Sequence, residues 1–252
     1  AYQRFKLEGL QAFDNPGFSS SPGNVTNKGY DDSTGWGVRV GYYGRPVAGV
    51  AVGLTYTSKV SMGDFDKYKG LFAEGGGFDM PSHYTAGIAF DVTPGTMLTA
   101  EYERINYSDV KSVSNPSILV LGCMAGQAAN CLGGSNGGGF GWKDINVFKL
   151  GIQTQYSPTL TLRAGYNYSD NPIKPEDVTI NILAPGVVQH HITAGATWKL
   201  DSTSAVTAAF MYAFSNDVKG ASFFNNFAPG LQLQEKIQMY EYSLGVQYSR
   251  TF

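Results

Sequence analysis

The chain has no apolar run long enough to cross a membrane as a helix. Its longest near-apolar stretch, Val47–Leu54, is far shorter than the roughly 18 residues that a membrane helix needs. Charged residues are also scarce, at 15% of the chain against about 25% in average soluble proteins. No transmembrane helix is therefore expected. A transmembrane β-barrel stays open, because its strands are only about 9–11 residues long and alternate in character.

Three further features are missing. The net charge is −2 without a basic run, so nothing indicates nucleic-acid binding. The sequence begins at Ala1 without the charged and apolar regions of a signal peptide, as a mature secreted protein or a fragment would. The glycine-rich stretch 133–139 has no lysine and no helix after it, so we interpret it as a flexible loop and not a phosphate-binding motif. No cofactor is expected.

Cysteine is rare. Cys123 and Cys131 are the only two, and they lie in a Gly/Ala/Asn-rich segment. A disulfide that closes a small exposed loop is favoured over two free thiols, and it would suit an oxidising compartment. A metal site is not expected, because no third or fourth ligand is near.

A period of two residues dominates what is present. In the last segment, residues 237–252, large aromatic and aliphatic residues take one parity and small or polar residues take the other. This pattern predicts a strand whose two faces meet different media. The terminal Phe252 resembles the end of a bacterial outer-membrane barrel, where such a residue helps the barrel assembly machinery to recognise the strand. An ordinary half-buried C-terminal strand fits this segment alone about as well.

Ten segments carry this period, and the first of them is the least regular. They run approximately Tyr2–Phe13, Gly35–Tyr43, Val50–Thr57, Ser82–Asp91, Met97–Tyr107, Ile145–Tyr156, Thr159–Ser169, Val188–Leu200, Ala205–Phe214 and Ile237–Phe252. The connections between them alternate between short turns and long loops. This alternation predicts an all-β, antiparallel up-and-down transmembrane β-barrel over residues 1–252, with short turns on one rim and long loops on the other. The apolar parity would face lipid, and the polar, glycine-rich parity would face the lumen.

Several stretches resemble the FadL family of outer-membrane transporters. They are Phe65–Glu74, Phe78–Pro81, Gly141–Asp144, Leu160–Tyr166 and Ala184–Val188. The similarity extends over most of the chain. It implies a monomeric 14-stranded barrel in the bacterial outer membrane, in contact with membrane lipid and lipopolysaccharide. It also implies an N-terminal plug, the hatch, inside the barrel.

Family members carry long-chain fatty acids, or in some branches aromatic hydrocarbons, across the outer membrane by diffusion. Because we count ten strands and see no plug, we expect the chain to be the C-terminal part of a longer protein, without the hatch and roughly four strands. A self-contained ten-stranded barrel is the alternative.

The loop 58–81 is the first candidate for ligand contact. Its apolar residues are expected to face water and to form part of the capture groove that the family resemblance implies: Phe65, Tyr68, Leu71, Phe72, Phe78 and Met80. The alternative, compatible with the first, is that these residues pack against neighbouring loops and close the rim. A second apolar patch is formed by Phe223, Phe224, Phe227 and Leu231.

For the carboxylate of a fatty acid, Lys149 and Arg163 are the candidate ligands, because both take the lumen parity and adjacent strands are expected to place them close together. The alternative is a lumen lined with paired charges, in which Glu101, Glu103 and Glu241 are the partners. The sequence thus predicts a hydrophobic-compound transporter. A general porin or a barrel adhesin is the alternative.

An enzyme is not expected. The chain has three histidines, His83, His190 and His191, and no nucleophile motif or acidic cluster stands beside them.

Overall fold

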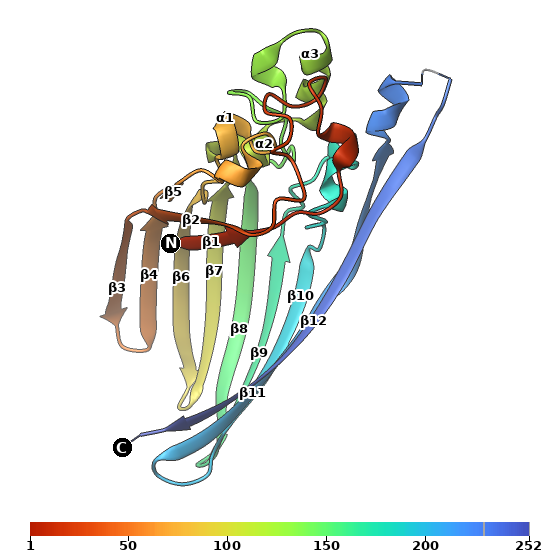
Figure 1. Ribbon diagram of the computed structural model, residues 1–252. Coiled ribbons are helices and arrows are strands. Elements are labelled where there is room, and N and C mark those ends of the chain that lie inside the picture. The colour runs from red at the N-terminus through yellow and green to blue at the C-terminus, as the bar shows by residue number, and fades with distance from the viewer. Residues whose placement is uncertain (229, 252) are drawn as a thin grey trace.

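The computed structural model describes residues 1–228 and 230–251, and Phe252 lies outside them. Nine antiparallel strands form one curved sheet, the wall, in the order β12-β11-β10-β9-β8-β7-β6-β4-β3 (Figure 1). The wall consists of β3 (Arg39–Val47), β4 (Val50–Thr57), β6 (Ser82–Thr93), β7 (Thr96–Asn106), β8 (Ile145–Ser157), β9 (Leu160–Ser169), β10 (His190–Lys199), β11 (Ser204–Ala221) and β12 (Gln234–Arg250). Each wall strand is followed along the chain by its neighbour in the wall, which confirms the up-and-down all-β class.

The first of the ten expected strands is not in the wall, so the predicted count was wrong by one. The segment Tyr2–Phe13 forms only the short strand β1 (Tyr2–Phe5) and the 3-10 turn η1 (Gln11–Phe13). Strand β1 belongs to a separate three-stranded sheet with β2 (Asp31–Trp36) and β5 (Ser61–Met62). The expected strand cannot continue to Phe13, because Gly9 and Leu10 adopt positive φ angles of 91° and 58°, which a strand does not tolerate.

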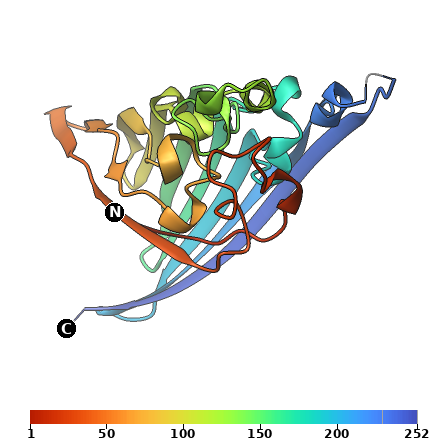
Figure 2. The same ribbon diagram turned by 45° about the horizontal axis from the view of Figure 1, so that its top comes forward.

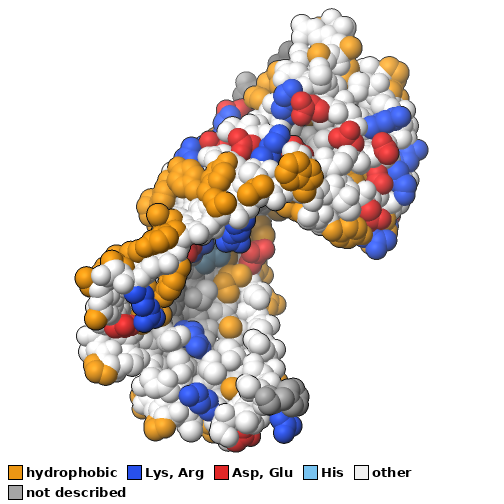
Figure 3. All heavy atoms as spheres, turned by 90° about the vertical axis from the view of Figure 1, so that its left-hand side faces the viewer, with side chains coloured by type: hydrophobic (Ala, Val, Ile, Leu, Met, Phe, Trp, Pro, Cys, Tyr) orange, Lys and Arg blue, Asp and Glu red, His pale blue; other side chains and the backbone are white. Residues whose placement is uncertain are grey.

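The two faces of the wall differ as the alternation predicts. One face exposes large apolar side chains, among them Trp198, Leu244 and Val246. The other face carries a polar row in which Glu101, Lys149, Asn167 and His191 lie opposite one another on β7 to β10. Figure 3 shows charged side chains and a histidine in the hollow of the sheet. The apolar face is the one suited to lipid, and the polar face lines the lumen.

The long connections all lie at one end of the wall, which we call the loop rim (Figure 1). They hold the short helices α1 (Ala73–Gly76), α2 (Lys111–Ser114), α3 (Val120–Met124), η2 (Asp66–Tyr68), η3 (Tyr107–Asp109), η4 (Ser117–Leu119), η5 (Ala128–Asn130), η6 (Pro175–Asp177), η7 (Ile180–Ile182) and η8 (Phe223–Asn226). Short turns join the strands at the opposite end. Among the described residues, no helix combines the length and the apolar character that a membrane span requires.

The buried apolar residues lie mainly in the loop rim and not between two layers of the wall. Three clusters form there, centred on Tyr68, on Val187 and on Phe223. The N-terminal segment, residues 1–30, crosses from the β3 side of the rim to the β12 side in both views (Figures 1 and 2). It therefore joins loops that lie far apart in the sequence.

Candidate functional site

Most of the candidate capture residues in the loop 58–81 are buried. Tyr68 is 0% exposed and Phe65 is 2% exposed, and Leu71 and Phe72 are buried with them. The expectation that these four side chains face water was therefore wrong, and the alternative of packing between loops is observed. The physical reason is that the N-terminal segment covers them, with the ring of Phe5 4.8 Å from that of Tyr68.

Tyr68 also fixes that cover by hydrogen bonds. Its hydroxyl donates to the carbonyl oxygen of Gly29 at 2.7 Å and accepts from the backbone N–H of Leu7 at 3.0 Å. Phe78 is half-buried against Phe72, with ring centroids 4.7 Å apart. Met80 is half-buried, and its backbone pairs with Val60. Four of the six residues are thus packed between loops, and Phe78 and Met80 are half-buried.

An apolar pocket of about 190 Å³ lies where the loops meet. The N-terminal segment, the loop 58–81, the loop 107–144, the loop 170–189 and the tip of the β11–β12 hairpin all contribute to it. Its lining residues are Leu10, Phe13, Leu71, Ser117, Val120, Leu132, Gly138, Gly139, Thr179, Ile180, Ile182, Leu183, Phe223 and Phe224. None of them is charged, and only Ser117 and Thr179 carry a polar side chain. The site therefore suits an uncharged apolar molecule.

Leu71 is the one predicted capture residue that lines this pocket, and Phe223 and Phe224 come from the second predicted apolar patch. Phe227 contacts the ring of Phe18 at 5.9 Å, and Leu231 is exposed. Sequence reasoning missed the remaining walls. The apolar residues of the segments 118–121 and 180–183 were the available signal.

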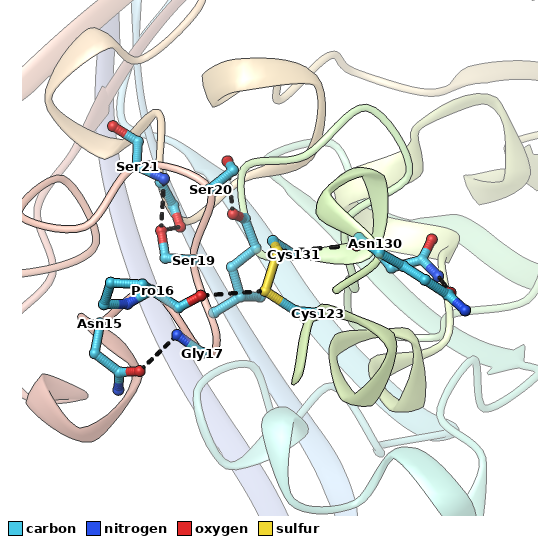
Figure 4. The surroundings of a disulfide bond; sticks show 12 residues. Asn15, Pro16, Gly17, Ser19, Ser20, Ser21, Cys123, Asn130 and Cys131 are labelled. Carbon is cyan, nitrogen blue, oxygen red and sulfur yellow. Dashed lines mark hydrogen bonds between the residues drawn. A yellow bond between two sulfur atoms is a disulfide. The ribbon is translucent and has the colours of Figure 1, made fainter. Parts of the chain in front are cut away.

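A disulfide stabilises one side of the pocket. Cys123 and Cys131 are bonded, with Cα atoms 4.6 Å apart. Val120 and Leu132, which line the pocket, lie just outside the two ends of this closed loop. Figure 4 shows the N-terminal segment alongside it, with the carbonyl oxygen of Pro16 near the sulfur of Cys123.

Backbone bonds hold the N-terminal segment to this wall. The N–H of Ser20 donates to the carbonyl oxygen of Leu132 at 2.9 Å, and the N–H of Leu132 donates to that of Phe18 at 2.8 Å. These two bonds fix the backbone of Leu132 against residues 18–20, beside the pocket that its side chain lines.

The candidate cations lie away from the pocket. Lys149 donates to Glu101 and to Glu103 at 2.8 Å each, so the alternative of paired lumen charges is observed for it. Arg163 donates to Gln153 at 2.7 Å and to Thr197 at 2.7 Å.

Lys149 and Arg163 are also not close together. Lys149 stands opposite Asn167, whereas Arg163 stands opposite Gln153. The two cations are offset by four residues along the strands, which corresponds to about 13 Å. The expectation that adjacent strands bring them together was wrong, because adjacency does not fix register.

The loop rim perturbs several ionisable groups. Burial, and then the charge of Glu103, raises the pKa of Tyr107, whose ring packs edge-on against Trp142 at 5.0 Å. A hydrogen bond to Asp79 raises the pKa of Lys59, and the two side chains lie 2.9 Å apart. These pairs hold the loops together and do not enter the pocket.

Comparison with known proteins decides the family. The family model described as outer membrane protein transport protein (OMPP1/FadL/TodX) matches residues 8–252. The chain belongs to this family. The resemblance seen in the sequence is thereby confirmed, and with it the location in the bacterial outer membrane. The family is one of transport proteins and not of enzymes.

Solved FadL-type structures share the fold. The P. putida toluene transporter TodX has a TM-score of 0.59 and 20% identity, over 89% of this chain and 50% of that chain. The CymD monoaromatic hydrocarbon channel has a TM-score of 0.55 and 19% identity, over 89% and 53%. A Pseudomonas aeruginosa FadL homologue has a TM-score of 0.54 and 14% identity, over 87% and 52%.

This chain therefore spans about half the length of these relatives. A comparison with curated proteins finds no match.

Proposed function

We propose that this protein is an outer-membrane channel for the passive uptake of hydrophobic compounds, and that the loop-rim pocket receives small uncharged hydrocarbons. The observation that carries the proposal is the pocket itself, whose lining has no charged side chain. Its position on the long-loop rim corresponds to the outer surface of an outer-membrane barrel. A hydrophobic molecule would meet this pocket before it reaches the polar lumen.

The size of the pocket supports one aromatic ring. A dry apolar cavity of about 150 Å³ is known to accept benzene, and this pocket has about 190 Å³. TodX and CymD are described as a toluene transporter and a monoaromatic hydrocarbon channel. These descriptions agree with the size of the pocket.

Long-chain fatty acids, the substrate expected from the family resemblance, fit this pocket less well. A buried carboxylate needs a cation or several hydrogen-bond donors. The pocket offers only Ser117 and Thr179, and Lys149 and Arg163 are held by lumen partners. A fatty acid would have to use a site elsewhere.

Equilibrium binding of labelled toluene to the whole protein in detergent tests the proposal, with oleate as competitor. We expect saturable toluene binding that Phe224→Asp abolishes and that Lys149→Gln and Arg163→Gln leave unchanged. Saturable oleate binding that the two Gln variants weaken would overturn the substrate class. A large steady ion conductance without ligand binding would make the protein a porin.

A further inference from the structure

The backbone N–H groups of Phe223 and Phe224, the aromatic wall of the pocket, are held by two hydroxyls that share one carboxylate. The N–H of Phe223 donates to Oγ1 of Thr179 at 2.9 Å, and this hydroxyl donates to Oε2 of Glu235. The N–H of Phe224 donates to Oγ of Ser222 at 3.2 Å, and this hydroxyl donates to Oε1 of Glu235 at 2.6 Å. Each carboxylate oxygen of Glu235 is therefore linked, through one hydroxyl, to the backbone N–H of one phenylalanine.

The carboxylate fixes the direction of both chains of hydrogen bonds. A hydroxyl has one hydrogen and two lone pairs, and it turns toward whichever partner is available. An ionised carboxylate only accepts, so Thr179 and Ser222 must both donate to Glu235. Their lone pairs are then free for the two N–H groups, and hydrogen bonds to a charged acceptor are the stronger kind. Without Glu235, each hydroxyl keeps only the bond that it accepts from its backbone N–H, and its own hydrogen loses the charged acceptor.

The hairpin below this network is already fixed. Pairing of β11 with β12 shifts at a bulge between Ala213 and Asn216 and then continues to Ala221. Above the bulge, Nδ2 of Asn216 donates to the carbonyl oxygen of Val187 at 2.8 Å. Gly220 lies directly against Pro175, where an added Cβ would come within 1.8 Å of the carbonyl oxygen. Within the hairpin, Asn225 holds the tip η8 through two bonds to the backbone of Leu233. Toward the loop 170–189, the N–H of Phe223 bonds to Thr179, and Glu235 accepts from that same hydroxyl and so braces the link.

We propose that Glu235 is a positioning residue for the ligand pocket. Through Thr179 and Ser222 it sets the place of Phe223 and Phe224, and thereby the affinity and the size selectivity of the pocket for hydrocarbons. This inference rests on the proposed function. Loss of the carboxylate lets η8 tilt away from the loop 170–189, so a one-ring ligand loses contact while a two-ring ligand gains room.

Toluene and naphthalene binding to the whole protein in detergent tests the inference. We expect Glu235→Ala to weaken toluene binding about tenfold and to lower the preference for toluene over naphthalene. Thr179→Val, which removes the hydroxyl and keeps the shape, should act in the same direction, and Thr179→Ser, which keeps the hydroxyl, should retain more of the toluene affinity than Thr179→Val. Asp217→Asn is the matched control, because Asp217 is an exposed carboxylate of the same hairpin, 3.6 Å from Lys236.

Hydrogen exchange of the peptide 222–228 gives a readout that does not depend on ligand. Faster exchange at Phe223 and Phe224 in Glu235→Ala, with no change in Asp217→Asn, supports the inference even if toluene is not the ligand. Unchanged exchange and an unchanged toluene-to-naphthalene ratio in Glu235→Ala would overturn it and would leave the proposed function standing. If the wild type binds neither hydrocarbon, the proposed function fails, and exchange alone decides the role of Glu235.

Discussion

Asn181 and Trp142, from two different loops, are joined by a hydrogen bond from the indole Nε1 to Oδ1 at 2.5 Å. Asn181 is 0% exposed, and its Nδ2 donates to the carbonyl oxygens of Phe140 and Asp177 at 2.7 and 2.8 Å. Both ends of this one amide are therefore satisfied inside the loop rim. Its chain neighbours Ile180 and Ile182 line the pocket, so the amide ties the pocket wall to the loop 107–144.

Asn181→Leu should loosen the loop rim by about 3 kcal/mol, because it leaves the indole N–H and two carbonyl oxygens buried without partners. The check is a red shift of tryptophan fluorescence together with faster hydrogen exchange in the segment 177–187. Asn136→Ala is the control, since Asn136 is exposed and makes a longer bond of 3.3 Å. Equal behaviour of the two variants would contradict the role of Asn181.

Substitutions at Leu71 and Phe72 should have different effects on toluene binding and on the stability of the loop rim. Leu71 lines the pocket, whereas Phe72 packs beneath it against Phe5 and Phe78. Leu71→Ala should weaken toluene binding and, because Leu71 is itself buried, should lower protease resistance, but less than Phe72→Ala does. Phe72→Ala should cost about 3–5 kcal/mol in the loop cluster, because it removes a buried ring. The prediction fails if Leu71→Ala is the more protease-sensitive of the two.

Removal of the disulfide should widen the pocket and leave the nine-stranded sheet unchanged. The Cys123→Ser, Cys131→Ser double variant should destabilise the closed loop by about 2–3 kcal/mol and weaken toluene binding severalfold. The measurement is binding before and after addition of a reductant. A reductant should reproduce the effect of the double variant in the wild type and should change nothing in the variant itself.

Gly220→Ala should displace the β11–β12 hairpin from the loop 170–189, because the new Cβ has no room beside Pro175. We expect weaker toluene binding and faster hydrogen exchange above the bulge. Gly245→Ala, on the same hairpin with nothing within 4 Å of the added Cβ, is the matched control. Wild-type exchange in Gly220→Ala would show that the contact yields without consequence.

Asp201 should make the turn between β10 and β11 sensitive to acid. Hydrogen bonds from the backbone and hydroxyl of Thr203, and then from Ser204, lower the pKa of Asp201 below its ordinary 3.8. A lowered pKa in the folded state adds stability above the unfolded pKa, and that stability is lost as the pH falls through the folded value. The midpoint of thermal unfolding should therefore drop more between neutral pH and about pH 3 in the wild type than in Asp201→Asn. Equal drops in both proteins would contradict this role.

The wall could be predicted from the sequence because each strand lies between two media. Lipid on one side and a polar lumen on the other impose the alternation seen in segments such as β8 and β9, so nine of the ten expected strands are present. The same rule does not fix which residues of neighbouring strands stand opposite each other. Lys149 and Arg163 were for that reason placed together wrongly.

The pocket could not be predicted, because its walls are brought together by loop packing. Leu10 and Phe13 were assigned to a strand, yet the left-handed backbone at Leu10 turns this segment toward the rim. Phe65 and Tyr68 were expected in water, and the same segment buries them. The sequence around an apolar loop residue does not indicate which other loop will cover it. The predicted roles of Phe252 in barrel assembly and of lipopolysaccharide as a partner remain predictions, and Phe252 lies outside the described residues.

The residues that line the pocket lie far apart in the sequence, and this separation affects when the pocket can form. Leu10 and Leu71 belong to the first part of the chain, whereas Phe223 and Phe224 lie just before the last strand. Contacts between such distant segments form late, because the intervening chain must first be ordered. The pocket is therefore expected to take shape only once the tip of the β11–β12 hairpin has packed against the first loops, after the intervening strands have paired.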